Sequence, residues 1–328
     1  MKALITTVPF AANNRLPLDL LERAGIEYLI NPLGKKLVEL ELISLLADFD
    51  VIIAGTEMIT KEVMSSAANL KFISRVGIGL DSVDLLSAQE LGVKVSYTPD
   101  APAPAVAELA MGLILSLLRS VHVSNMQLHL GYWHRYFGRR LSECVVGVIG
   151  VGRVGRCLLN HLSGFNCKKV LLNDLEMNSD FTESMVVEWV DKETIYREAD
   201  IISLHVPLTN KTRNMVCKEQ LEMMKSDAVL INTARGGIIN ERDLYSALKA
   251  GHLSGVAIDV FEQEPYSGNL SEIDRCLLTA HMGSMSIDCR SEMELLATKE
   301  VIRFFNDEPL LGLVPEDEYI IQRMEKVI

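Results

Sequence analysis

Short apolar segments alternate with segments of helical periodicity over almost the whole chain, and this alternation limits the folds open to it. In the first part of the chain, strands are expected at 3–8, 27–30, 51–54, 71–74 and 93–96. Helical spacing of apolar residues covers 37–47, 61–67 and 83–90. Strands that alternate with helices build parallel sheets with helices on both faces. The pattern therefore predicts an α/β protein.

A Pro-rich break containing Pro99, Pro102 and Pro104 interrupts the alternation. Prolines this dense do not fit a helix interior or a central strand, so they predict a linker, followed by one long helix over 105–128. Further strands are then expected at 145–149, 170–173, 201–205, 229–232, 255–259 and 277–279. The last helical pattern, 286–307, is expected to cross back to the first domain. Two domains are predicted, one of residues 1–100 plus 285–328 and one of residues 101–284.

Length and composition agree with two soluble domains, since 328 residues are about twice the usual domain size. With 48% hydrophobic and 23% charged residues, the chain is too apolar for a disordered protein. Its net charge of -12 has the wrong sign for following a nucleic acid or an anionic membrane, so neither partner is expected. The longest apolar stretch, 109–118, is shorter than the ~20 residues of a membrane span. No amino-terminal signal is recognisable, and a cytoplasmic protein is expected.

Cysteine and histidine spacing gives no sign of a metal site. The six cysteines form no C-x-x-C pair, and the seven histidines form no H-E-x-x-H motif. His122, His129 and His134 are spaced so that one helix face would not carry all three. Buried free thiols in a reducing compartment are the simpler interpretation. No metal is predicted.

Residues 145–156 combine an apolar strand, the pattern G-x-G-x-x-G and the start of a helix. Gly150 permits the tight turn, Gly152 lets the backbone approach a pyrophosphate, and Gly155 lets helix and strand pack closely. Asp174 closes the next expected strand, where a carboxylate can accept hydrogen bonds from an adenosine ribose. A glycine-rich turn before any packed helix is the alternative, but strand, glycines and acid together favour dinucleotide binding. A carboxylate at Asp174 repels a 2′-phosphate, which favours NAD over NADP.

Three further segments, 230–237, 258–265 and 278–284, fall at the ends of expected strands, where open α/β sheets bind ligands. With the glycine segment and the loop Arg75-Val76-Gly77-Ile78-Gly79, they make the chain resemble the D-isomer-specific 2-hydroxyacid dehydrogenases over nearly its whole length. The resemblance implies two Rossmann-like doubly wound domains, a discontinuous flavodoxin-like substrate domain and a continuous NAD-binding domain. It also implies NAD as the cofactor and a small anionic 2-hydroxy or 2-oxo acid as the substrate.

The residue types at these strand ends suit that chemistry. A 2-oxo acid needs a planar cation such as Arg235 to hold its carboxylate and carbonyl, and Gly236 and Gly237 would let a ligand approach closely. Hydride delivery to a carbonyl carbon creates an alkoxide that must gain a proton, a task for a histidine held by a carboxylate. By resemblance, His281 is the proton donor and acceptor, Glu264 its partner and Arg235 the substrate clamp. An arginine or a histidine after a strand can also be purely structural.

The resemblance implies binding residues as well. For the cofactor they are Gly150, Gly152, Arg153, Val154, Gly155, Asp174, His205, Val206, Pro207, Thr233, Ala234, Asp259, Gly283 and Ser284. Arg153 and Val154 are expected under the pyrophosphate and Asp259 near the nicotinamide amide. For the substrate they are Arg75, Val76, Gly77 and Arg235, with backbone amides of the loop 76–79 holding the carboxylate. A homodimer is also implied.

Within the family, the chain most resembles the phosphoglycerate dehydrogenases. Arg75 and Arg135 match positions where that subgroup places phosphate-facing arginines, the second reaching across a dimer. Either arginine could equally be a solvated surface charge. Glu57 would instead repel a phosphate, and Pro102 and Ala105 stand where the subgroup has Asn and Ser. D-3-phosphoglycerate, interconverted with 3-phosphohydroxypyruvate, is the leading substrate expected. Glyoxylate or hydroxypyruvate is the alternative.

Two other classes of protein stay open. A redox-inactive NADH-sensing protein can use the same scaffold, although Arg235, Glu264 and His281 together favour catalysis. Formate and phosphite dehydrogenases also share the scaffold. The formate enzymes carry glutamine where Glu264 stands, so they rank lower.

Overall fold

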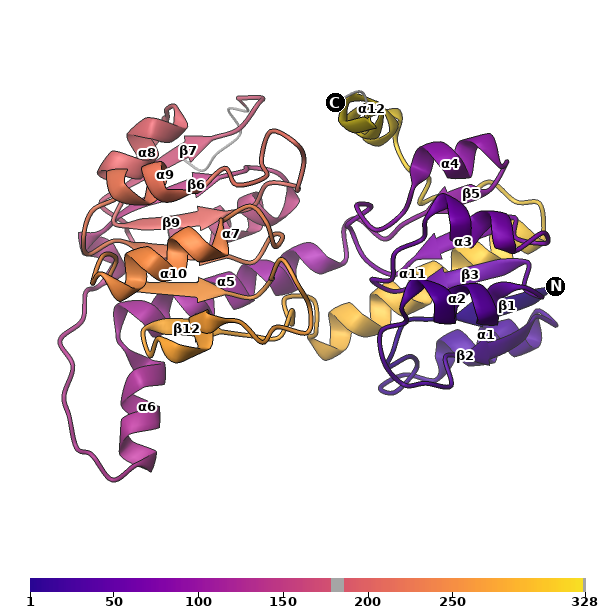
Figure 1. Cartoon of the computed structure of the whole chain (residues 1–328), viewed down its shortest axis with the longest axis horizontal. Helices are drawn as coiled ribbons and strands as arrows, with labels where there is room; N and C mark the ends of the chain where they lie inside the picture. The colour runs from indigo at the N-terminus through magenta and orange to yellow at the C-terminus, as the bar shows by residue number, and fades with distance from the viewer. Residues whose placement is uncertain (178–185, 327–328) are drawn as a thin grey trace. The chain divides into compact units, whose positions relative to one another are not determined.

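The computed structural model describes residues 1–177 and 186–326. The chain divides into two compact units, Met1–Pro102 with Met285–Ile328 and Ala103–Ser284, each built on one parallel sheet (Figure 1). The strands are β1 (Lys2–Ile5), β2 (Glu27–Ile30), β3 (Val51–Ala54), β4 (Phe72–Arg75), β5 (Lys94–Ser96), β6 (Val145–Ile149), β7 (Lys169–Asn173), β8 (Val187–Trp189), β9 (Ile201–Leu204), β10 (Val229–Asn232), β11 (Gly255–Ile258) and β12 (Cys276–Leu278). The helices are α1 (Leu16–Arg23), α2 (Glu39–Leu46), α3 (Lys61–Ser66), α4 (Leu85–Glu90), α5 (Pro102–Leu118), α6 (Val121–His129), α7 (Arg153–Ser163), α8 (Lys192–Glu198), α9 (Lys218–Met223), α10 (Glu241–Lys249), α11 (Ile287–Phe305) and α12 (Glu316–Lys326), with short 3-10 turns at Leu141–Glu143 and Asn269–Glu272. The predicted α/β class is confirmed.

The sheet of the continuous unit has seven strands in the order β12-β11-β10-β9-β6-β7-β8. Helices α5 and α7 cover one face, and α8, α9 and α10 cover the other. On β10, Leu230 packs towards α8, α9 and α10, whereas Val229 and Ile231 pack towards α5 and α7. Because side chains alternate along a strand and both faces are covered, β10 is apolar from Val229 to Ile231, and only its last residue, Asn232, is polar. The strand order reverses between β6 and β9, which is where doubly wound sheets bind ligands.

The other unit has five strands in the order β2-β1-β3-β4-β5, the flavodoxin-like order. Helices α2, α3 and α4 cover one face of this sheet. Helix α11, from the carboxyl-terminal segment, packs on β3 and β4. The hydroxyl of Ser74 donates to the carbonyl oxygen of Ala297 at 2.8 Å, and the rings of Phe72 and Phe304 stack at 4.7 Å. These contacts make the segment after residue 285 part of this unit's core.

The expected single helix over 105–128 is two helices, α5 and α6, bent by 65°. Ser120 between them has a φ of +50°, a left-handed conformation that ends α5. Helix α5 also begins earlier than expected, at Pro102, with Pro104 in its first turn. Prolines are tolerated there because the amides of a first turn have no intrahelical acceptor. No single described helix is long and apolar enough to cross a bilayer, although α5 and α6 taken together reach that length and composition.

Several elements have no residue range among the sequence predictions, and these include α1, β8 and α12. Helix α12 forms in the acidic tail and packs on α4. The side chain of Gln322 anchors it, because Nε2 donates to the carbonyl oxygen of Val83 at 2.8 Å and Oε1 accepts from the amide of Leu85 at 2.9 Å. Val314 and Tyr319 also pack on the apolar core of this unit, so polar and apolar contacts that depend on the tertiary fold together order the tail.

Candidate active site

The seven-stranded sheet brings the expected residues of its unit to one edge. Its strands are parallel, so their carboxyl ends share that edge. From β7 through β6, β9, β10 and β11 to β12, the edge carries in order Asp174, the glycine loop 150–155, His205, the segment 233–235, the segment 259–264 and His281. The residues expected to bind the adenosine half therefore lie towards one end of this series, and the expected catalytic residues lie towards the other.

The glycine loop is packed too tightly for side chains at two positions and is open at a third. A Cβ on Gly155 would lie 2.1 Å from the carbonyl oxygen of Gly150. One on Gly150, whose φ is +97°, would lie 2.5 Å from the carbonyl oxygen of His205. A Cβ on Gly152 would meet nothing within 4 Å, and Gly152 caps α7 without a side-chain hydrogen bond. An anion can occupy that place at the helix amino end. The helix begins with the expected residues Arg153 and Val154.

Asp174 is held rigidly at the carboxyl end of β7. Its Oδ2 accepts from the amide of Val151 and its Oδ1 from the amide of Leu175, both at 2.6 Å. The carboxylate is thereby fixed beside the glycine loop, next to a fully solvated Leu175 side chain. A fixed negative charge here can accept from ribose hydroxyls and opposes a 2′-phosphate.

Two buried polar atoms near the middle of the edge have no partner among the described residues, namely Nδ1 of His205 and Oγ1 of Thr233. Nε2 of His205 lies 2.8 Å from Oγ of Ser203. Burial lowers the pKa of His205 to about 4, so the ring is neutral at pH 7. Buried polar groups normally have a partner, so these two atoms suit a polar ligand lying along the edge. The neighbouring expected cofactor residues are Val206, Pro207 and Ala234.

Arg235 lies in the turn after β10, and buried Asn232 fixes this turn. Asn232 donates from Nδ2 to the carbonyl oxygen of Arg235 at 2.8 Å and accepts at Oδ1 from the amide of Ala234 at 3.0 Å. The partly exposed guanidinium of Arg235 donates from Nη1 to the carbonyl oxygen of Ala234 at 2.7 Å. Asn232 is a functional residue that the sequence reasoning missed. A polar residue closing an apolar strand was the available signal.

The glycines after Arg235 serve the protein's own packing. A Cβ on Gly236 would lie 1.9 Å from the carbonyl oxygen of Phe261, in the turn after β11. Gly237 has a φ of +81°, and its carbonyl oxygen accepts from the amide of Asn214 at 2.7 Å. Gly236 therefore lets the turn carrying Arg235 pack on the turn that leads to Glu264, which is a different role from the room for a ligand that was expected of it.

His281 and Glu264 form a hydrogen-bonded pair after two adjacent strands, β12 and β11. Nδ1 of His281 lies 2.8 Å from Oε2 and 3.0 Å from Oε1 of Glu264. A carboxylate only accepts, so Nδ1 carries the proton and Nε2 is left for a substrate. The imidazole is 36% exposed and the carboxylate 24%. A partly exposed, oriented imidazole of this kind can give and take a proton at Nε2.

Asp259 shapes the turn that carries His281. Its buried carboxylate accepts from the hydroxyl of Thr279 at 2.6 Å and from the amides of the two residues after His281, both at 2.9 Å. These bonds hold His281 at a φ of +49°, a left-handed conformation that is uncommon for a residue other than glycine. Both carboxylate oxygens of Asp259 already accept hydrogen bonds from this turn, so a nicotinamide amide bound to Asp259 would have to share them. The turn contains the expected residues Gly283 and Ser284.

In the discontinuous unit, the protein itself engages two of the four loop amides that were expected to hold a carboxylate after β4. The amide of Val76 donates to the carbonyl oxygen of Ala54 at 2.9 Å, and that of Gly77 donates to Oγ1 of Thr98 at 2.7 Å. Both are therefore engaged by the protein. Within the described part of the chain, the next two amides, 78–79, have no such acceptor. A carboxylate at this loop would be received by 78–79 rather than by Val76 and Gly77.

The two arginines expected to face a phosphate lie in different units and different surroundings. Arg75 is 6% exposed, and its Nη1 donates to the carbonyl oxygen of Val76 in its own loop. Glu57 of the same unit is also buried, and its Oε2 accepts from the hydroxyl of Thr6 at 3.0 Å. Arg135 of the other unit is exposed in the segment after α6.

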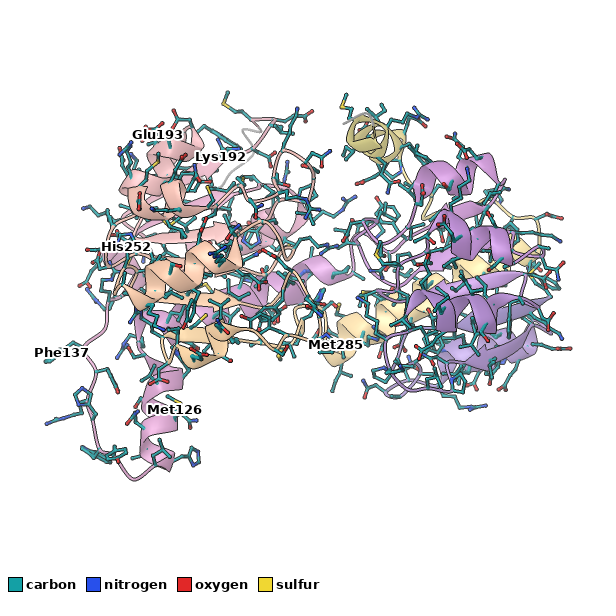
Figure 2. All side chains as sticks on the ribbon, viewed as in Figure 1. Met126, Phe137, Lys192, Glu193, His252 and Met285 are labelled. Atoms are coloured by element: carbon teal, nitrogen blue, oxygen red, sulfur yellow. The ribbon has the colours of Figure 1, made fainter. Side chains whose placement is uncertain are left out.

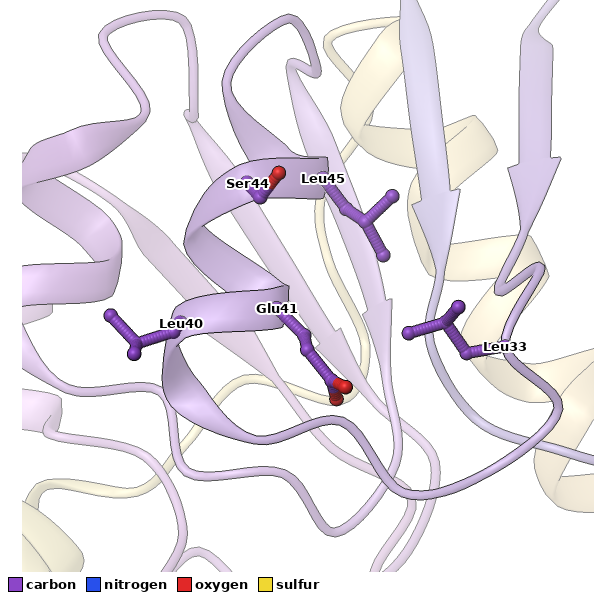
Figure 3. A pocket seen from close by; sticks show the side chains of 5 residues that line it. All are labelled: Leu33, Leu40, Glu41, Ser44 and Leu45. Atoms are coloured by element: carbon purple, nitrogen blue, oxygen red, sulfur yellow. The ribbon is translucent and has the colours of Figure 1, made fainter.

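Other polar clusters and hollows add nothing to the site. Within residues 1–177 and 186–326, no three His, Cys, Asp or Glu side chains gather as metal ligands, and all six cysteines are free. An open hollow of about 370 Å³ beside α2 is lined by Leu33, Leu40, Glu41, Ser44 and Leu45 (Figure 3). It is mostly apolar and shares no residue with the strand ends described above.

Residues 111–283 match the model of the D-isomer-specific 2-hydroxyacid dehydrogenase NAD-binding domain. The match covers more than half of the chain and contains both the glycine loop and the His281–Glu264 pair. The chain belongs to this family. As a family member, it has a Rossmann domain that binds NAD, the cofactor expected from the sequence.

Relatives of this dehydrogenase are named after several different substrates. The chain is 36% identical over 298 residues to a glyoxylate reductase of Thermofilum pendens, and the match covers 88% of this chain and 87% of the relative. It is 36% identical over 274 residues to a D-3-phosphoglycerate dehydrogenase of Methanocaldococcus jannaschii, covering 82% of this chain but only 52% of that relative. The solved NAD complex of a formate dehydrogenase from Staphylococcus aureus superimposes with a TM-score of 0.83 at 29% identity, over 96% of this chain and 99% of that one.

The residues of this dehydrogenase fit NAD. The open position at Gly152 and the amino end of α7 suit a pyrophosphate, and the fixed carboxylate of Asp174 suits a ribose diol. The unpartnered hydroxyl of Thr233 lies farther along the same edge, between the glycine loop and the His281–Glu264 pair. Bound NAD would supply hydride chemistry at the end of the edge that carries His281.

Proposed function

We propose that this dehydrogenase reduces a small, unphosphorylated 2-oxo acid, glyoxylate or hydroxypyruvate, to the corresponding 2-hydroxy acid with NADH. The His281–Glu264 pair, hydrogen-bonded at 2.8 Å, carries the proposal. Glu264 follows β11, the neighbour of the strand β10 that leads to Arg235, and His281 follows β12, one strand further along the same sheet edge. A proton donor and a planar cation on one edge are what carbonyl reduction of an oxo acid requires.

Each residue has a defined task in this proposal. The guanidinium of Arg235 binds the oxo acid and orients its carbonyl. Nε2 of His281 delivers a proton to the carbonyl oxygen as negative charge develops there, and it takes the proton back in the reverse reaction. Glu264 keeps the imidazole oriented through Nδ1 and stabilises the imidazolium. Asp259 holds the turn that presents His281.

Two observations favour an unphosphorylated substrate. The relatives include several glyoxylate reductases and a hydroxypyruvate reductase beside the phosphoglycerate dehydrogenase. The guanidinium of Arg75 is buried against its own loop, and Glu57 places a buried carboxylate in the same unit. 3-Phosphohydroxypyruvate is the second candidate, supported by the relative from Methanocaldococcus jannaschii and by the presence of Arg75. An NADH sensor without turnover would have no use for an oriented His281–Glu264 pair.

The test is NADH oxidation with glyoxylate, hydroxypyruvate, 3-phosphohydroxypyruvate and pyruvate, each repeated with NADPH. We expect kcat/KM for glyoxylate or hydroxypyruvate to exceed that for the phosphorylated acid by at least about tenfold. A preference for 3-phosphohydroxypyruvate would replace the leading substrate by the second. No turnover with any of the four acids would refute the dehydrogenase proposal and favour the sensor.

We also propose that the protein is a homodimer formed through the aromatic arm, which we define as α6 and residues 130–137. Trp133 is 82% exposed and Phe137 fully so, and Leu128 and Leu130 are exposed beside them. Figure 2 shows Met126 on α6 and Phe137 on the segment that follows. Contiguous exposed apolar surface marks an interaction site, and a second copy of the arm would cover it by symmetry.

Light scattering should give a dimer for the native chain and a monomer for the double variant W133S/F137S. A native monomer would refute the assembly.

A further inference from the structure

Asn232 closes β10 in the middle of the seven-stranded sheet. Its backbone lies between two neighbouring strands, in register with Leu204 of β9 and Ile258 of β11. Its carbonyl oxygen accepts from the amide of Asp259 at 3.0 Å, and the residue is 1% exposed. Core strands are the parts of a fold that open least readily. The side chain of Asn232 therefore starts from a fixed position at the sheet edge that carries Arg235.

Three hydrogen bonds connect the side chain of Asn232 to Arg235 within four consecutive residues. Nδ2 of Asn232 donates to the carbonyl oxygen of Arg235 at 2.8 Å, and Oδ1 accepts from the amide of Ala234 at 3.0 Å. The carbonyl oxygen of Ala234 accepts in turn from Nη1 of Arg235 at 2.7 Å. Ala234 is thus bonded at its amide to Asn232 and at its carbonyl to the guanidinium. Both the backbone and the side chain of Arg235 therefore depend on the position of Asn232.

The amide of Asn232 suits these bonds better than related side chains would. One bond needs a donor and the other an acceptor, and an asparagine amide carries both. An aspartate has nearly the same shape but only accepts when ionised, so its second oxygen would face the carbonyl oxygen of Arg235 and repel it. An alanine side chain would reach neither group. The buried amide is tolerated at the end of an apolar strand because both of its ends are paired.

The residues on either side of this turn have other contacts. Oγ1 of Thr233 has no partner among the described residues, so this hydroxyl does not brace the turn. Gly236 packs against the backbone of Phe261 and fixes the chain on the far side of Arg235. Asn232 fixes the same turn on its near side, at the strand.

We propose that Asn232 is a positioning residue for substrate binding, whose side-chain amide holds Arg235 in the orientation that receives the 2-oxo acid. The inference rests on the proposed function, in which the guanidinium of Arg235 binds the oxo acid. A planar cation forms two parallel bonds to a carboxylate only at the right angle, and a binding group has to be held within about 0.5 Å of its productive position. A displaced turn would therefore weaken binding even where no chemistry follows.

The experiment measures the dissociation constant of oxalate, with NADH present, by titration calorimetry. Oxalate is a planar anion that resembles a 2-oxo acid and that NADH does not reduce. We expect Asn232→Asp and Asn232→Ala each to weaken oxalate binding to the full chain by at least about tenfold, and to raise KM for glyoxylate by a similar factor. NADH binding should weaken by less than about threefold, because the glycine loop and Asp174 lie at other strand ends.

Asn240→Ala is the matched control, because it removes another asparagine whose side chain bonds to the backbone. Asn240 caps α10 by accepting from the amide of Asp243 at 3.0 Å. Its loss should lower the midpoint of thermal unfolding and leave oxalate binding unchanged. A purely structural Asn232 would behave in the same way, so native oxalate affinity in the Asn232 variants would overturn the proposal. Asn232→Ala decides if Asn232→Asp fails to fold.

Arg235→Gln distinguishes a failure of this inference from a failure of the proposed function. We expect this variant to weaken oxalate binding, and adding Asn232→Ala to it should cause less than about threefold further loss, because Asn232 acts through Arg235. Fully additive losses would show that Asn232 acts by another route and would overturn the proposal. An unchanged oxalate affinity in Arg235→Gln would refute the proposed role of Arg235, and the inference with it.

Discussion

Nδ1 of His281 lies 2.8 Å from Oε2 of Glu264, and the two residues follow adjacent parallel strands, β12 and β11. This hydrogen bond occupies Nδ1 and leaves Nε2 for another molecule. Asp259, at the end of β11, accepts from the backbone of the His281 turn. One strand end therefore supplies both the partner of the imidazole and the support for its backbone.

His281→Ala should abolish most turnover while leaving cofactor binding intact. We expect kcat to fall by about 10² to 10⁴, the usual contribution of a general acid, because the imidazole acts in the transition state. NADH affinity, measured by fluorescence titration, should change by less than about threefold, since the glycine loop and Asp174 belong to other strand ends. Equal losses in turnover and in NADH affinity would contradict the assignment.

Asp174→Ala should narrow the preference for NAD over NADP. The carboxylate that two backbone amides fix beside the glycine loop is the group that would repel a 2′-phosphate. We expect the ratio of kcat/KM values for the two cofactors to fall by at least about tenfold. Glu176→Ala is the matched control, because it removes an exposed charge two residues away. An unchanged ratio would show that the ribose contact lies elsewhere.

Local sequence patterns predicted much of the fold because the relevant signals are local. A run such as 229–231 is apolar at every position because both faces of its strand are covered. Polar residues begin at Asn232, where the chain reaches the sheet edge. The glycine loop could also be predicted from the sequence, because Gly150 and Gly155 each approach another part of the backbone too closely for a Cβ atom. The roles of Arg235, Glu264 and His281 came from resemblance and remain proposals, although the structure does place Glu264 beside His281.

Features that depend on distant partners could not be predicted. The left-handed turn at Ser120 carries no residue signature, so the helix break was missed. The amide of Gly77 is engaged by Thr98, a residue 21 positions away, which only the folded β4–β5 pair brings near. The packing of Gly236 on Phe261 and the bonds between Glu241 and Glu262 likewise join segments that are separate in sequence.

Gly236→Ala should destabilise the protein although the substitution is small. The added Cβ would overlap the backbone of Phe261, which cannot rotate away as a side chain could. We expect the free energy of unfolding to fall by about 1 to 3 kcal/mol, the range for overpacking. Gly112→Ala is the control, because that glycine lies exposed in α5 with nothing within 4 Å of its Cβ position, and it should stabilise by up to about 1 kcal/mol. Urea unfolding of both variants gives the comparison, and a neutral Gly236→Ala would contradict the packing.

Acid should destabilise the protein partly through His205, whose pKa burial lowers from 6.5 to about 4. Below pH 6.5 the unfolded chain binds a proton at this residue, whereas the folded chain does not until the pH approaches 4, so stability falls as the pH drops through this window. Between pH 7 and pH 5 the loss amounts to about 2 kcal/mol. His205→Gln removes the titration, so its free energy of unfolding should fall less over the same interval. Urea unfolding at pH 7, 6 and 5 measures both proteins, and parallel losses in the native chain and His205→Gln would show that the folded protein accepts the proton.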